Sequence, residues 1–103
     1  MGGLLNSERT GRVLADVLDE RAIQDAKWGE QNHATGEWFK ILLEELGEAA
    51  EADLTADWEQ YRRKLISVAA VAVAAVEGFD RQTEQELAEL DQELAELGGE
   101  NDD

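Results

Sequence analysis

The sequence contains no cysteine and no proline in 103 residues. Without cysteine, the chain cannot form a disulfide scaffold or a metal site built on thiolates. The absence of proline, together with an abundance of Ala, Leu and Glu, favours an all-α protein. Basic residues are also scarce, because nine Lys and Arg stand against 25 Asp and Glu and give a net charge of −16. So acidic a surface repels nucleic acid polymers and anionic membranes, and we expect neither as a partner.

Long apolar segments are missing as well. The longest apolar run covers residues 65–76, which is too short to span a bilayer. The N-terminal residues lack the apolar region and the cleavage site of a signal peptide, so we predict a cytoplasmic protein. A chain of this length forms one domain with a modest core, which makes oligomerisation advantageous.

Hydrophobic periodicity predicts about four helices, over residues 8–28, 37–54, 57–79 and 83–98. A loop with Gly29 and Gly36 separates the first two, and Asp57 and Thr83 each open a stretch resembling an N-terminal capping box. The predicted fold is an antiparallel helical bundle. We expect residues 1–82 to form its helical domain, residues 83–98 a C-terminal amphipathic helix, and residues 99–103 an acidic disordered tail.

Two apolar patterns suggest contacts between subunits. Residues 65–76 are apolar on every face except at Ser67, so that helix must be surrounded. The last predicted helix carries a narrow row of leucines at a spacing of three and four, formed by Leu87, Leu90, Leu94 and Leu97. Two heptads are too few for an independent coiled coil, so the row docks on the rest of the fold or on a partner subunit. We therefore expect a homodimer or a homotetramer.

The second predicted helix carries a row of acids. At about 100° per residue, Glu37, Glu44, Glu48 and Glu51 share one ridge, whereas Glu45 falls within the apolar arc. Burying an unpaired carboxylate is unfavourable, so Glu45 needs a cation or several hydrogen-bond donors. Glu48 lies close enough for both carboxylates to bind one Mg²⁺ or Mn²⁺ ion. The alternative is that the ridge is solvated and Glu45 pairs with Arg or Lys.

Residues 44–48, "EELGE", resemble the EExxE motif of the all-α NTP pyrophosphohydrolases, the MazG-like superfamily. The flanking segments "RAIQDAKWGEQNH" (21–33) and "YRRKLISVAAVAVAAVEGFDR" (61–81) resemble, in matching order, a subgroup from actinobacteria and their phages. The resemblance implies an oligomeric helical bundle that binds the triphosphate of a nucleotide through Mg²⁺ and releases a nucleoside monophosphate and pyrophosphate. Carried over residue by residue, it makes Glu44, Glu45 and Glu48 the metal ligands and catalytic residues.

The chain departs from this family in its second acidic motif, where it has Lys64 and Ser67. Lys64 could neutralise Glu45 or Glu48 in the space of the metal, or contact the substrate phosphates as a point charge. Glu77 and Asp80 are further acids on the same predicted helix, but they lie about three and four turns beyond Lys64. The leading hypothesis is a Mg²⁺-dependent nucleoside triphosphate pyrophosphohydrolase. The alternatives are a catalytically degenerate MazG-like oligomer that binds a nucleotide or a partner protein, and a purely structural assembly module.

Other candidates for nucleotide binding lie around the first loop. Trp28 could stack on a base, Asn32 could hydrogen-bond its edge, and His33 is the only histidine. Each also has a structural interpretation: a tryptophan completes a core, an asparagine caps a helix, and a loop histidine packs on its neighbours.

Overall fold

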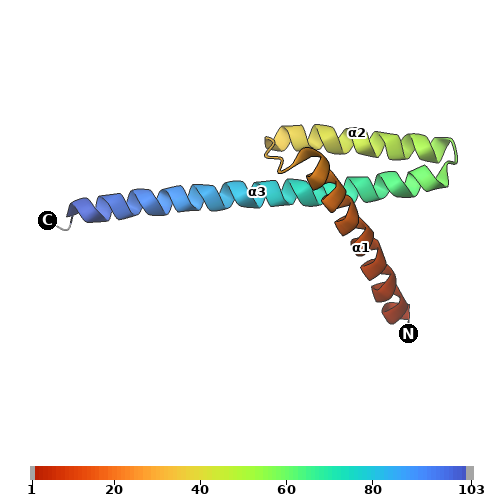
Figure 1. Cartoon of the computed structure of the whole chain (residues 1–103), viewed down its shortest axis with the longest axis horizontal. Helices are drawn as coiled ribbons and strands as arrows, with labels where there is room; N and C mark the ends of the chain where they lie inside the picture. The colour runs from red at the N-terminus through yellow and green to blue at the C-terminus, as the bar shows by residue number, and fades with distance from the viewer. Residues whose placement is uncertain (1, 102–103) are drawn as a thin grey trace.

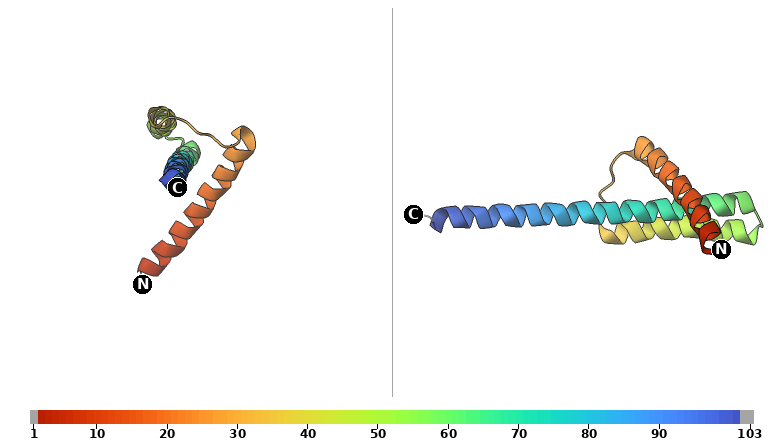
Figure 2. Two further views of the ribbon diagram at one scale, coloured as in Figure 1. Left: turned by 90° about the vertical axis from the view of Figure 1, so that its left-hand side faces the viewer. Right: turned by 90° about the horizontal axis from the view of Figure 1, so that it is seen from below.

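The computed structural model describes the backbone of residues 2–101 and the side chains of residues 6–98, and this part of the chain consists of three α-helices. Helix α1 spans Gly2–Trp28, α2 spans Thr35–Leu54 and α3 spans Trp58–Asn101. Helices α2 and α3 lie side by side and antiparallel, and α1 crosses α3 at a steep angle (Figures 1 and 2). The prediction of an all-α protein is confirmed, and no strand occurs among the described residues.

The prediction of about four helices is wrong, because the third and fourth merge into the 44-residue helix α3. The predicted break after Phe79 contains neither Gly nor Pro, so nothing there prevents the helix from continuing. Side chains also bridge this region one turn apart, because Gln82 Nε2 donates to Glu86 Oε1 at 3.3 Å. The segment at Thr83 that resembles a capping box is therefore ordinary helix interior.

Helix ends also differ from the prediction. The backbone is helical from Gly2 and up to Asn101, beyond the expected limits of residues 8 and 98. Of the predicted disordered tail, residues 99–101 have the helical backbone of α3 instead, and residues 102–103 lie outside the described residues.

Two tight turns define the ends of α1 and α2. Gly29 adopts a left-handed conformation, with φ of 72°, and its N–H donates to the Asp25 carbonyl at 2.8 Å. Ala56, in the turn before α3, has φ of 54°, which is unfavourable for a residue with a Cβ atom. Asp57 then caps α3 as predicted, because its Oδ1 accepts a hydrogen bond of 3.3 Å from the Gln60 N–H.

The core is thin and lies between α2 and α3. Trp38 of α2 packs against Val71 and Ala74 of α3, and partly buried apolar residues surround this cluster. These are Ile41, Leu42 and Ala75. The packing holds α2 and α3 together and thereby fixes the polar side chains that face each other further along the two helices. None of the described helices is long and apolar enough to cross a membrane.

Candidate functional site

Glu45 lies on the side of α2 that faces α3, where it is partly buried. Its Oε2 accepts a hydrogen bond of 2.9 Å from the Ser67 hydroxyl on α3. Glu45 and Ser67 are 22 residues apart in the chain, and only the antiparallel packing of the two helices brings them together. The partner of this carboxylate is therefore a neutral hydroxyl.

One turn further along α2, Glu48 forms an ion pair with Lys64 of α3. Lys64 Nζ lies 2.5 Å from Glu48 Oε2, and both side chains are less than half exposed. The hydrogen bond from Lys64 to Glu48 raises the pKa of Lys64, partial burial lowers it, and the charges of Glu48 and Glu45 raise it further, with a net increase. The ammonium group occupies the space beside Glu48 that a metal ion would need.

The three predicted metal ligands are not gathered around a common point. Glu45 and Glu48 both contact side chains of α3, whereas Glu44 is exposed to solvent. Among the described residues, no three His, Asp or Glu side chains are arranged so that they could hold a metal ion. The arrangement of side chains seen here therefore does not fit a Mg²⁺ ion bound by Glu44, Glu45 and Glu48.

A hollow of about 430 Å³ opens beside the Lys64–Glu48 pair. Acidic side chains from α2 and from the turn before α3 line it, namely Glu48, Glu51 and Asp57. Gln60 also lines this hollow, and its Oε1 is buried without a hydrogen-bond partner. A buried amide oxygen normally accepts a hydrogen bond or binds a cation, so this atom marks an unsatisfied acceptor at the edge of the hollow.

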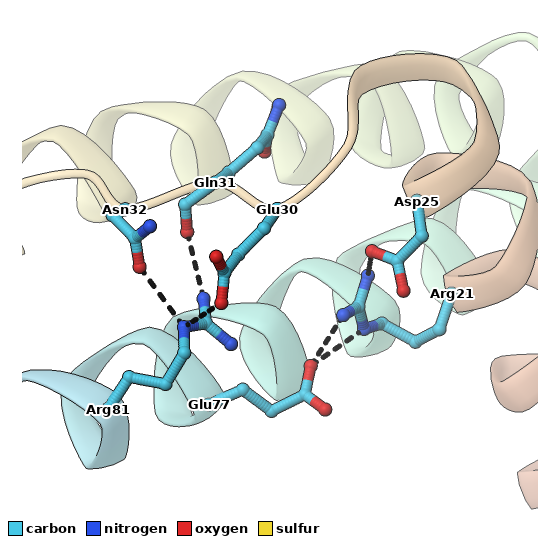
Figure 3. A network of polar contacts seen from close by, with 7 residues as sticks. All are labelled: Arg21, Asp25, Glu30, Gln31, Asn32, Glu77 and Arg81. Atoms are coloured by element: carbon cyan, nitrogen blue, oxygen red, sulfur yellow. Dashed lines mark hydrogen bonds and ion pairs between the residues drawn. The ribbon is translucent and has the colours of Figure 1, made fainter. Parts of the chain in front are cut away.

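A second group of polar residues joins the loop after α1 to the middle of α3 (Figure 3). Arg81 of α3 lies 2.8 Å from the Glu30 carboxylate and donates to Asn32 Oδ1 and to the Gln31 carbonyl, each at 3.1 Å. These contacts hold the loop against α3. Asn32 is a predicted nucleobase ligand, but its side-chain oxygen is already engaged by Arg81.

Arg21 of α1 anchors the other side of the same region. Its guanidinium lies 2.9 Å from Asp25 and 2.5 Å from Glu77 of α3. Partial burial lowers the pKa of Arg21, but the hydrogen bonds and charges of Glu77 and Asp25 outweigh this effect and raise it. A cavity of about 330 Å³ lies between this ion pair and Arg81. The acids around it neutralise both arginines.

Two further predicted nucleotide-binding residues, His33 and Trp28, lie near the start of α2 and at the end of α1, respectively. His33 Nδ1 is 3.1 Å from Glu37 Oε2, and its ring meets the Trp38 ring edge-on at 4.8 Å. Trp28 is exposed at the end of α1, with Lys27 Nζ 4.7 Å from its ring centre. His33 therefore packs on its neighbours, as in its structural interpretation.

The predicted nucleotide-binding residues thus fall into two separate groups. Arg81, which contacts Asn32, is 17 residues from Lys64 on one straight helix, a separation of about 25 Å. Trp28, Asn32 and His33 therefore do not share a site with Lys64 within one chain.

Sequence reasoning missed the contacts made by Arg21 and Arg81. Glu77, which the sequence places about three turns beyond Lys64, pairs with Arg21 in the structure. The spacing of Arg21 and Asp25, four residues apart in a helix, is a signal that could have indicated an ion pair. The contact between Arg21 and Glu77 spans 56 residues and leaves no local signal.

No family model, curated protein or solved structure matches the chain in comparisons of its sequence and fold. The structure shows three α-helices in the described part of the chain, of which α2 and α3 bring Glu45 and Glu48 against Ser67 and Lys64.

Proposed function

We propose that this chain is a catalytically degenerate MazG-like protein that binds a nucleoside triphosphate without hydrolysing it. The observation that carries this proposal is the ion pair between Lys64 and Glu48 across α2 and α3. Lys64 stands where the resembled motif has an acid, and its ammonium serves as the counter-ion of the Glu48 carboxylate. The neighbouring carboxylate, Glu45, is likewise satisfied from within the chain by Ser67.

The electrostatics explain how a nucleotide can still bind. A net charge of −16 repels a triphosphate, so the ligand needs a local cation. Lys64 can turn from Glu48 to a phosphate oxygen, because a lysine ammonium donates three hydrogen bonds from a flexible stem. The hollow next to Lys64 supplies room for a phosphate group at that position.

A Mg²⁺-dependent pyrophosphohydrolase is the second candidate, and one observation favours it. Gln60 Oε1 is buried without a partner at the edge of the hollow that Glu48, Glu51 and Asp57 line. Oxygen donors of this kind suit Mg²⁺ or Mn²⁺. Such an enzyme would require Lys64 to leave Glu48, so that Glu44, Glu45 and Glu48 could act as the resemblance implies.

Pyrophosphate release from a panel of NTPs and dNTPs, with and without Mg²⁺, separates the two candidates. We expect no release from the native chain and Mg²⁺-dependent release from Lys64→Glu, which restores the missing acid. Nucleotide binding by the native chain, measured by calorimetry, should weaken at least tenfold in Lys64→Gln. Release by the native chain that Glu45→Gln abolishes would support the hydrolase instead.

Lys40→Glu is the matched control, because Lys40 is exposed on α2 and the substitution changes the charge by the same amount. It should neither create pyrophosphate release nor weaken binding. If the native chain shows neither binding nor hydrolysis with any nucleotide, both candidates fail.

A further inference from the structure

Helix α3 carries an apolar face that its own chain leaves uncovered. The C-terminal half of α3 extends well past the ends of α1 and α2 (Figure 1). Every described side chain from residue 84 to residue 98 is exposed. Its four leucines, Leu87, Leu90, Leu94 and Leu97, are each 50–57% exposed. A row of leucines at this spacing is not a feature of a helix that stays in water alone.

The same face continues toward the N-terminal end of α3. Val73, Val76 and Phe79 are 40%, 59% and 58% exposed, although they belong to the part of α3 that packs on α2. At about 100° per residue, these three and the four leucines lie within an arc of about 120°, opposite the side that carries Ala74 and Gly78. We call these seven residues the open face of α3; it extends for about 36 Å.

A single copy of the chain buries little apolar surface, so leaving this face exposed to water is unfavourable. Of the seven apolar residues that are buried among the described side chains, four are alanines. The radius of gyration is 19.9 Å, whereas a compact chain of this length has about 13 Å. Covering the open face of α3 would therefore add burial of apolar surface that the single chain lacks.

We propose that the open face of α3 packs antiparallel against the open face of a second copy of this chain. The charges select this occupant and this direction. Residues 84–98 contain six acids and no base, whereas residues 65–79 contain a single charged side chain, Glu77, which is paired with Arg21. An antiparallel pair places the acidic half of each helix beside the almost uncharged half of the other.

A parallel pair would be disfavoured by the same charges. It would align the two acidic halves and bring Glu86 of one copy beside Asp91 of the other, twice in each dimer. It would also place the two Asp80 side chains opposite each other in the middle of the interface. The antiparallel arrangement avoids these pairs of like charges, apart from the meeting of Glu84 with Glu77 of the second copy.

The side chains are also complementary in size. Continuing the heptad of the leucine row back along α3 places Leu87 opposite Val76 of the second copy, and Leu90 opposite Val73 of the second copy. In both pairs a leucine meets the smaller valine, which lets the two helices approach closely.

Light scattering coupled to size exclusion tests the interface on the full chain at concentrations of tens of micromolar. The native protein should be a dimer, and Leu90→Glu/Leu94→Glu should be a monomer. The matched control, Ala88→Glu/Ala95→Glu, adds the same charge to the same segment but away from the open face, and should remain dimeric. A monomeric native protein, or equal loss of the dimer in both variants, would overturn the proposal.

Disulfide cross-linking tests the direction, because the chain has no cysteine of its own. In an antiparallel dimer, the double variant Leu87→Cys/Val76→Cys should form a covalent dimer on oxidation, whereas Leu87→Cys alone should not. Efficient cross-linking of Leu87→Cys alone would show parallel helices and contradict the antiparallel arrangement. Helicity measured by circular dichroism before oxidation confirms that each variant is folded.

Discussion

Individual residues decide what the acidic row on α2 can do. Glu44, Glu45 and Glu48 fall within five positions, yet each has different surroundings: solvent for Glu44, the Ser67 hydroxyl for Glu45 and the Lys64 ammonium for Glu48. A carboxylate near apolar surface is stable only when its partner compensates for lost hydration. Here two residues of α3, Ser67 and Lys64, provide that compensation.

The hydrogen bond between Ser67 and Glu45 should contribute measurably to stability. Replacing Ser67 with Ala removes the donor and leaves a partly buried carboxylate without it, and we expect a loss of about 1 kcal/mol in the free energy of unfolding. Urea denaturation of Ser67→Ala, Glu45→Gln and the double variant gives the coupling energy. Strictly additive effects of the two substitutions would contradict the interaction.

The ion pair of Lys64 should give stability a specific dependence on alkaline pH. Folding raises the pKa of Lys64 above its ordinary value of 10.5, chiefly through the hydrogen bond to Glu48. The stabilisation is thus complete below that ordinary value and disappears as the pH rises through the folded pKa. The difference in unfolding free energy between native protein and Lys64→Met should therefore be constant below about pH 10 and shrink as the pH rises above 10.5.

The exposed Lys40 supplies the control for this measurement. Lys40→Met removes the same charge from α2, and its difference from the native protein should change much less over the same pH range. Parallel curves for both variants would indicate that general deprotonation, and not the contact with Glu48, governs the alkaline loss of stability.

Among the elements, α1 and α2 end where the sequence predicts, although α1 begins at Gly2 instead of residue 8, whereas α3 merges two predicted helices. Periodicity and the Gly29 break predicted the ends of α1 and α2 near Trp28 and Leu54, where the structure has them. The sequence predicted a new helix at Thr83, whereas α3 is continuous there, because a capping-box pattern is compatible with both a helix start and a helix interior. The contacts of Arg81 with the loop, which hold this part of α3 in place, come from residues about 50 positions away.

Gly29 and Ala56 both have left-handed backbone conformations, so we expect exchanging Gly and Ala to change the stability in opposite directions at the two positions. Gly29→Ala places a Cβ atom at φ of 72° and should destabilise the protein by about 1 kcal/mol. Ala56→Gly relieves the strain at φ of 54° and should stabilise it by about 0.5–1 kcal/mol, since the greater freedom of Gly in the unfolded chain offsets part of the gain. Thermal unfolding of both variants beside the native protein measures these changes.

Gly47→Ala provides a reference for this pair. Gly47 lies within α2 with φ in the ordinary range, and apart from the adjoining backbone of α2 nothing lies within 4 Å of the position that an alanine Cβ would take. Alanine there should therefore stabilise the protein through helix propensity alone. If Gly29→Ala stabilised the protein as Gly47→Ala should, the left-handed turn after α1 would not be required by the fold.

For the whole molecule, shape and charge dominate. The molecule is elongated, with a longest extent of 72 Å, and it carries a net charge of −16. Its thin core and the open face of α3 leave much apolar surface to be covered, while its acids oppose close approach of another acidic surface. The proposed antiparallel pairing of two copies would cover this apolar surface while keeping the two acidic halves apart.

Self-repulsion should make the stability of the whole molecule dependent on salt. Raising NaCl from about 0.01 M to 0.3 M shortens the screening length several-fold, and we expect the melting temperature to rise by several degrees. Neutralising three acids of the exposed helix, in Glu86→Gln/Glu93→Gln/Glu96→Gln, should raise the melting temperature at low salt and reduce its salt dependence. A melting temperature that falls with salt would indicate that attractive ion pairs outweigh the repulsion.

The sequence by itself determined the helical class, the C-terminal ends of α1 and α2, the Asp57 cap and the anomalous placement of Glu45, because each depends on local spacing and propensity. Only the tertiary structure decided which groups meet that carboxylate and its neighbour. Ser67 and Lys64 reach Glu45 and Glu48 across 22 and 16 positions of the chain, through the packing of Trp38 against Val71 and Ala74. Contacts of this kind depend on how two helices are rotated and aligned, and no local pattern encodes that alignment.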